Sequence, residues 1–132
     1  MKSRDHSNIL PLTAAILVSV FMLASCGLKV SKGDVNSGIS KGIHVGSDKA
    51  EIIKYLDSLE VNGVKPVRSD YIREAPGYTV IAPDGKTEVE AIGKVSVSFS
   101  NGVGGGFYFC ESVVSIFYFD RSDKLITWVT DC

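Results

Sequence analysis

The sequence predicts an α+β domain of two layers, in which one N-terminal helix packs on a four-stranded antiparallel meander sheet. Apolar residues recur at helical spacing between residues 48 and 60. After residue 77 they alternate with polar residues, as in strands that bury one face. Turn-forming residues separate the alternating stretches, so consecutive strands are expected to pair.

Residues 1–25 have the pattern of a lipoprotein signal peptide. Lys2 and Arg4 precede an uncharged run, residues 9–24, which is interrupted by Pro11 and is shorter than the roughly 20 residues of a membrane span. The run ends in Leu23-Ala24-Ser25-Cys26, which resembles the bacterial lipobox. That resemblance implies cleavage before Cys26 and a diacylglycerol thioether on its sulfur, with an acylated (palmitate-type) amine. The alternative is an ordinary secretory peptide with a chance cysteine.

The residue after Cys26 is Gly27 and not the aspartate that commonly retains lipoproteins at the inner membrane. This favours the periplasmic face of the outer membrane in a Gram-negative host; in a Gram-positive host the anchor would lie in the cytoplasmic membrane. The full chain has a formal net charge of −1, and removal of Lys2, Arg4 and Asp5 makes it slightly more acidic. No basic face is implied, which argues against nucleic acid as a partner.

Residues 26–43 are rich in Gly, Ser, Lys and Asp, and they predict a flexible tether between the lipid and the domain at residues 44–132. A flexible chain of this length would hold the domain roughly 20 Å from the lipid surface. Val30, Val35 and Ile39 fit no period of two, which argues against a docked first strand.

A helix is predicted at about residues 48–60. Asp48 and Glu51 have capping-box spacing, and Asn62-Gly63 supplies a stop. The apolar stripe consists of Ile52, Ile53, Leu56 and Leu59.

Four strands are predicted beyond an irregular stretch that contains Pro66 and Pro76. They span about residues 78–82, 87–100, 107–119 and 124–132, and the turns contain Pro83-Asp84-Gly85 and Asp120–Asp123. In the second strand, Gly93 suggests a bulge or a strong twist. Its dry face would carry Val89, Ala91, Val95, Val97 and Phe99, and its wet face Glu88, Glu90, Lys94, Ser96 and Ser98.

Cys110 and Cys132 are expected to form a disulfide, because paired cysteines are usual in small exported domains. A two-residue turn between the last two strands would place them on opposite faces. A three-residue turn, or a bulge near Glu111, would bring them together. A redox pair is disfavoured, because the spacing is not C-x-x-C.

The chemistry-bearing residues form no catalytic or metal-binding pattern, so we expect neither an enzyme nor a cofactor. His44 has no spaced partners for a zinc site, and it precedes the helix as a surface residue would. Asp120 and Asp123 lack the rest of a calcium loop, and Glu88 with Glu90 are solubilising carboxylates. The Gly-rich stretch 101–106 lacks the G-K-[ST] of a phosphate loop.

Aromatic residues near the last two strands are candidate partner contacts. Phe107, Phe109 and Trp128, with Tyr78 and Tyr118, would form an exposed binding patch, unless the strand is central and they belong to the core. The predicted function is a non-catalytic protein-binding or assembly module that is lipid-anchored in the cell envelope. The alternative is a periplasmic hydrolase inhibitor that inserts the loop at residues 101–106 into a cleft.

Two segments resemble the small outer-membrane assembly lipoproteins of the SmpA/OmlA type. They are Gly46-Ser47-Asp48 with the following Ile52, Ile53 and Leu56, and the hairpin Ile116–Leu125, "IFYFDRSDKL". In that family a lipobox and a tether precede a helix and a short sheet. The resemblance implies the same α+β arrangement and a non-catalytic role in the envelope with a protein partner.

Overall fold

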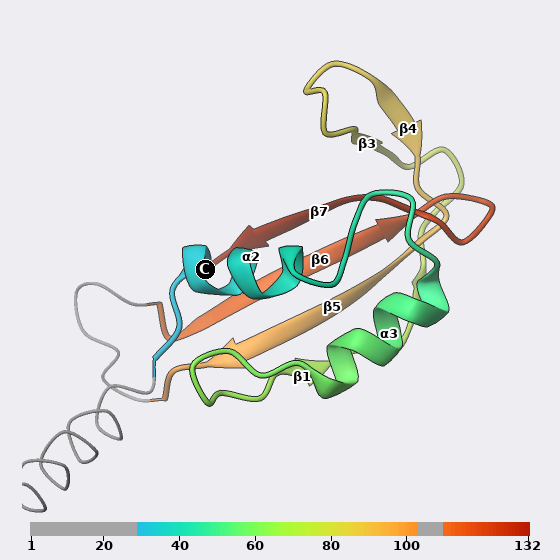
Figure 1. Ribbon diagram of the computed structural model, residues 1–132. Coiled ribbons are helices and arrows are strands. Elements are labelled where there is room, and N and C mark those ends of the chain that lie inside the picture. The colour runs from blue at the N-terminus through green and yellow to red at the C-terminus, as the bar shows by residue number, and fades with distance from the viewer. Residues whose placement is uncertain (1–28, 103–109) are drawn as a thin grey trace, which may run out of the picture.

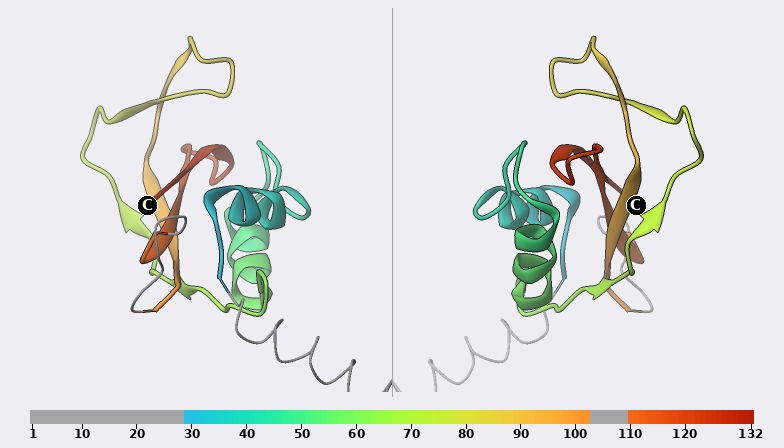
Figure 2. Two further views of the ribbon diagram at one scale, coloured as in Figure 1. Left: turned by 90° about the vertical axis from the view of Figure 1, so that its left-hand side faces the viewer. Right: turned by 90° about the vertical axis from the view of Figure 1, so that its right-hand side faces the viewer.

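The computed structural model describes residues 29–102 and 110–132, which form a two-layer α+β domain (Figure 1). Helices α2 (Lys32–Ser40) and α3 (Lys49–Ser58) lie on the same face of a five-stranded antiparallel sheet (Figure 2). A separate two-stranded hairpin, β3–β4, projects from one end of this sheet.

The large sheet is built around the two long strands β5 (Gly93–Ser100) and β6 (Ser112–Phe119). β7 (Leu125–Asp131) continues the meander beyond β6. On its other side, β5 pairs with two short strands, β1 (Val67–Arg68) and β2 (Ile72–Arg73). The projecting hairpin consists of β3 (Thr79–Ile81) and β4 (Glu88–Glu90).

The predicted helix at residues 48–60 is confirmed as α3, with Ile52 and Leu56 buried on its inner side. Asp48 occupies the N-cap position in extended backbone, but its carboxylate pairs with Lys124 and makes no side-chain cap hydrogen bond. The predicted stop at Asn62-Gly63 is wrong, because α3 ends at Ser58 and its C-cap residue, Leu59, is already extended. Asn62 and Gly63, with positive φ values of 50° and 78°, instead form the turn between the paired residues Val61 and Val64.

The expectation of a flexible tether is wrong for residues 29–43, since they contain a second helix that packs on the sheet. Ser31 and Asp34 form a reciprocal capping box at the start of α2. Val35 and Ile39, four residues apart, both have 0% exposure, and the flanking Val30 and Ile43 are equally buried. The apolar residues therefore follow a helical period, and the folded domain begins before residue 44.

The predicted four-stranded meander is correct only for its last three strands. The stretch at 87–100 divides at Ala91-Ile92, because its first half pairs with β3 in the separate hairpin. The fourth position in the sheet is taken by β1 and β2, which come from the proline-bearing segment that was expected to be irregular. Short strands beside prolines occur at sheet edges, which is where both lie.

The main core lies between the helices and the sheet. Its largest members are Phe99, Phe117 and Phe119, which all have 0% exposure. Gly93 is not a bulge; it starts β5 and lies against the ring of Tyr71, so a Cβ there would overlap that ring. Tyr71 in turn packs on Phe119, with ring centroids 6.3 Å apart. The glycine thus allows a close approach between the β1–β2 segment and the sheet.

Cys110 and Cys132 lie at disulfide distance, with Cα atoms 5.5 Å apart. The strand register does not bring them together in the expected way. β6 and β7 pair Ser115 with Thr130, and the irregularity in this pairing lies beside Phe119 and not near Glu111. The cysteines meet because β6 begins only at Ser112 and the chain bends at Glu111, outside the sheet.

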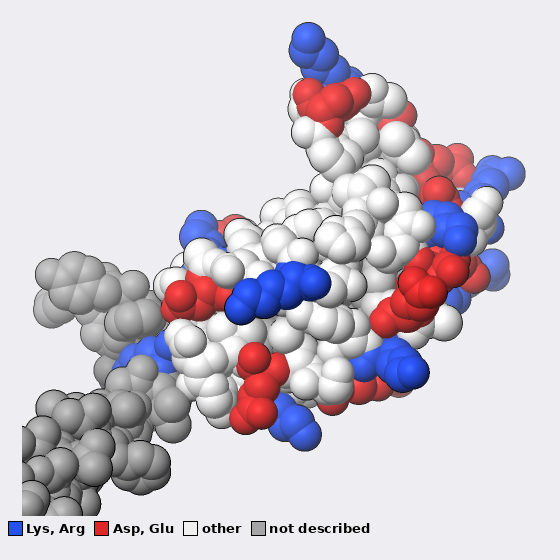
Figure 3. Space-filling model, viewed as in Figure 1, with Lys and Arg blue, Asp and Glu red and all other residues white. Residues whose placement is uncertain are grey.

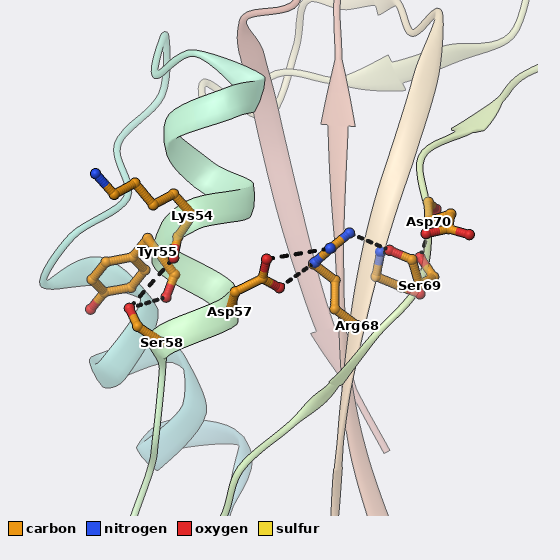
Figure 4. Close-up of polar contacts among 8 residues, drawn as sticks. Lys54, Tyr55, Asp57, Ser58, Arg68, Ser69 and Asp70 are labelled. Carbon is orange, nitrogen blue, oxygen red and sulfur yellow. Dashed lines mark hydrogen bonds and ion pairs between the residues drawn. The ribbon is translucent and has the colours of Figure 1, made fainter.

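α3 is fastened to the edge of the sheet by an ion pair (Figure 4). Arg68 on β1 donates to Asp57 on α3, with Nε 2.6 Å from Oδ1. Its Nη1 donates to the carbonyl oxygen of Ser69. The hydrogen bond that Arg68 donates to Asp57 raises the pKa of the guanidinium, so Arg68 keeps its positive charge.

Candidate functional site: the outer face of the sheet

The outer face is the side of the large sheet that points away from both helices (Figure 2). Paired residues on neighbouring strands project to the same side of a sheet, so the register assigns its members. Since Val95, Val97 and Phe99 point into the helix-covered core, the alternating residues of β5 point outward. Cross-strand pairing then places on this face Val67, Ile72, Lys94, Ser96, Ser98, Ser100, Ser112, Val114, Ile116, Tyr118, Thr127, Val129 and Asp131.

This outer face carries a concentration of exposed apolar side chains. Six large hydrophobic side chains are exposed among the described residues. Val67, Ile72 and Val129 lie on the outer face, with 76%, 52% and 53% exposure, and Tyr78 adjoins them at 38%. The remaining two are Ile81 on the hairpin and Val45 in the loop between the helices. Clustering of most exposed apolar residues on one face is typical of an interaction surface.

The β3–β4 hairpin forms a wall at one end of the outer face. Ala91, Tyr118 and Ile126 make a second small core there, and Val80 and Val89 from the hairpin pack against it. The rings of Tyr78 and Tyr118 stack with centroids 6.0 Å apart. These contacts fix the base of the hairpin, so the outer face has a raised end and carries apolar side chains beside the polar residues of β5.

Ionisable side chains surround the tyrosine pair at the base of this wall. Glu74 Oε1 lies 2.9 Å from Lys94 Nζ, and this interaction raises the pKa of Lys94. Burial, and secondly a hydrogen bond with Tyr78, raises the pKa of Tyr118 to about 12. Arg121 Nη2 lies 3.0 Å from Glu90 Oε1 across the same region. The charges are therefore paired and the tyrosine is neutral at physiological pH.

A cavity of about 520 Å³ opens beside these ion pairs. Its walls come from the β2–β3 connection, the β4–β5 junction and Arg121. Its lining includes Arg73 and Arg121 as well as Glu74 and Glu90, so the cavity offers both hydrogen-bond donors and acceptors.

The structure describes only one of the three candidate partner contacts that the sequence suggested, Trp128. Trp128 lies on the helix-covered side, half buried, where it stacks on Phe117 and donates to Asn36 of α2. It therefore does not belong to the outer face. Phe107 and Phe109 lie outside the described residues, as does the lipidation candidate Cys26.

His44 is exposed beside the start of α3, as expected, and its backbone N–H donates to Ser47. Within residues 29–102 and 110–132, no three His, Cys, Asp or Glu side chains are grouped so that they could hold a metal ion. None of the helices in this described part is long and apolar enough to span a bilayer. Figure 3 shows acidic and basic side chains intermixed over the helix-bearing side.

Sequence reasoning named Tyr78 and Tyr118 as part of an exposed patch but missed the aliphatic residues of the outer face, because it took the outward side of the strand at 87–100 as polar. That holds for β5, where the outward residues are lysine and serines. In β6, however, the residues that point outward are Val114, Ile116 and Tyr118, so this strand is apolar on both sides. A strand with apolar residues on both sides, next to a strand that alternates, was the sign in the sequence that the second side of the sheet is either covered or used for binding.

Comparison with known proteins gives no relative for this chain: no family model, no curated protein and no solved structure matches it.

Proposed function

We propose that the protein is a lipid-anchored, non-catalytic component of the cell envelope whose outer face binds a partner protein. The lipobox at Leu23–Cys26 supports the anchor, and a Gram-negative host would place it on the periplasmic face of the outer membrane. The resemblance to SmpA/OmlA-type lipoproteins supports an assembly role.

The observation that carries the binding proposal is the exposed apolar area on the sheet side that no helix covers. Val67 and Ile72 lie along one edge of this face and Val129 lies on β7 at the other edge, with the polar residues of β5 and the apolar Val114 and Ile116 of β6 between them. Tyr78, which is 38% exposed and stacks on the buried Tyr118, adds aromatic area at the raised end of this face. Aromatic and aliphatic groups with a polar rim are the usual composition of a protein interface.

A pair of matched substitutions tests this role of the outer face. Val129 and Val45 are both 53% exposed, but only Val129 lies on the outer face. The assay is chemical crosslinking in cell envelopes, followed by purification of the tagged protein with any bound partner. We expect Val129→Glu to abolish recovery of the partner, because a carboxylate would lose its hydration in the contact. Val45→Glu should leave recovery unchanged. Equal recovery with both variants would contradict the assignment of the face.

The anchor is tested separately with Cys26→Ala. This variant should leave the membrane fraction, and labelled palmitate should no longer be incorporated. If the wild-type protein were found in the soluble fraction, the lipidation would be contradicted, whatever the outcome for the outer face. If a soluble hydrolase is captured by both the wild type and Cys26→Ala, the inhibitor alternative replaces the assembly role.

A further inference from the structure

We propose that the domain stands directly on the lipid surface by one end, and that this posture holds the outer face and the hairpin away from the lipid. This inference rests on the lipidation of Cys26 in the proposed function. The end in question, called here the anchored end, is where residues 29–30, Asn101 and Cys110 meet.

The chain is fastened to the folded domain only a few residues after Cys26. Val30 has 0% exposure, and its N–H donates to Asn101 Oδ1 at 2.8 Å while its carbonyl accepts from Asn101 Nδ2 at 2.9 Å. Lys29 is held as well, since its Nζ donates to the Asn101 carbonyl and its own carbonyl accepts from Asn62. The segment that links the lipidated Cys26 to the folded domain, called here the leash, therefore ends at Lys29.

The leash is too short to lift the domain off the membrane. Only three residue steps separate Cys26 from Lys29. A chain spans at most about 3.3–3.6 Å per residue in any conformation, so the reach is about 10 Å. A tether up to residue 43 would have 17 residue steps, so its extended reach would be more than five times as long. The anchored end must therefore lie within about 10 Å of the lipidated sulfur's position at the membrane surface.

The position of the anchored end determines which surfaces remain free. Asn101 follows the last residue of β5, and the hairpin joins this strand at its first residue, Gly93. At about 3.3 Å per residue, the strand separates the hairpin from the anchored end by about 25 Å (Figure 1). Val30 leads directly into α2, which lies in the helix layer and not on the outer face.

The chemistry of the anchored end fits contact with a headgroup layer through the covalent anchor. Lys29 and Lys32 lie there together with Asp34, Glu111 and Asp131, and Lys32 pairs with Asp131 at 3.5 Å. Because the acidic groups at this end outnumber the two lysines, the surface is polar and has no strong attraction to anionic lipid of its own. The lipid on Cys26 thus determines the posture.

Nitroxide labels can test this posture on the full-length lipidated protein. It is reconstituted in phosphatidylethanolamine–phosphatidylglycerol vesicles that contain a nickel-chelating lipid, which relaxes nearby labels. The labels are placed at the anchored end (Lys32→Cys), on the outer face (Ile72→Cys) and at the hairpin turn (Lys86→Cys), all exposed positions. Intact-mass analysis confirms the lipid on Cys26 and the bond between Cys110 and Cys132.

We expect relaxation to be several-fold stronger at Lys32→Cys than at the other two positions. A Gly-Ser insertion of about 12 residues after Gly27 should lower it there, because it gives the domain a reach of roughly 20 Å. The strongest relaxation at Ile72→Cys would mean that the outer face lies on lipid, and equal relaxation at all three would mean that no posture is fixed; either result overturns the proposal. An unmodified Cys26, with no protein on the vesicles, would instead refute the lipidation.

Discussion

Asn101 is expected to be the most sensitive polar residue of the domain. It has 7% exposure and its side chain makes three hydrogen bonds, two with Val30 and one to the carbonyl of Cys110 at 2.7 Å. Asn101→Ala leaves the N–H and the carbonyl of the fully buried Val30 without partners. Each unpaired buried group costs about 1–3 kcal/mol, and partial entry of water reduces the sum, so we expect a loss of about 3 kcal/mol.

Urea unfolding of a secreted form without the lipobox leader measures this loss. Trp128 is a suitable fluorescence probe, because it stacks on the core residue Phe117 with ring centroids 6.3 Å apart. Asn36→Ala is the matched control: the Asn36 Oδ1 atom accepts from Trp128 and Thr130, but at the protein surface, where water replaces the lost bonds. It should cost less than about 1 kcal/mol.

Hydrogen exchange on the same variants locates the effect. Asn101→Ala should raise amide exchange in residues 30–39, since their attachment to the sheet is lost, while β5 and β6 stay protected. If Asn101→Ala changed stability by no more than Asn36→Ala does, the fastening of the N-terminal segment would be refuted, and with it the short leash.

Three further predictions follow from the packing. Burial raises the pKa of Tyr118 in the folded protein to about 12, against 10.0 for an ordinary tyrosine. The contribution of its protonated hydroxyl to the free energy of unfolding is therefore fully present below pH 10 and is lost as the pH rises toward 12. The wild type should therefore lose about 1–2 kcal/mol relative to Tyr118→Phe over that interval in pH-dependent urea titrations, and parallel curves would contradict the assignment. Reduction of the pair Cys110–Cys132, which are 22 residues apart, should destabilise the domain by about 3 kcal/mol in the same assay, and an unchanged midpoint would show that the bond is absent. Gly93→Ala should cost about 1–3 kcal/mol because the methyl group meets Tyr71, and a double-mutant cycle with Tyr71→Ala should remove most of that cost; additive effects would refute the contact.

Local signals in the sequence were sufficient for α3 and for the β5–β7 meander. The Ile52–Leu56 stripe and the alternation from Val95 to Phe99 each depend on neighbours in the sequence, and the structure uses both. α2 carried equally local signals in its Ser31–Asp34 box and its apolar pair four residues apart. It was missed because a Gly- and Ser-rich composition outweighed the spacing, although tertiary burial compensates for low helix propensity.

The features that the sequence did not predict depend on contacts between distant residues. Nothing local to Asn101 shows that it binds Val30, 71 residues away. Likewise, the break at Ala91-Ile92 depends on which strand each half of the segment pairs with. The outer face follows only once the pairing of β1, β2, β5, β6 and β7 is known, since Val67, Ile72 and Val129 come from separate parts of the chain.

Site-specific photocrosslinking in living cells tests the central claim most directly. A benzoylphenylalanine placed at Ile72 or Val129 reports on the outer face, and one at Val45 reports on the loop between the helices. We predict a common crosslinked partner of defined mass from Ile72 and Val129 and none from Val45. Crosslinking from Val45 alone, or an equal yield at all three positions, would contradict the assignment of the outer face as the binding surface.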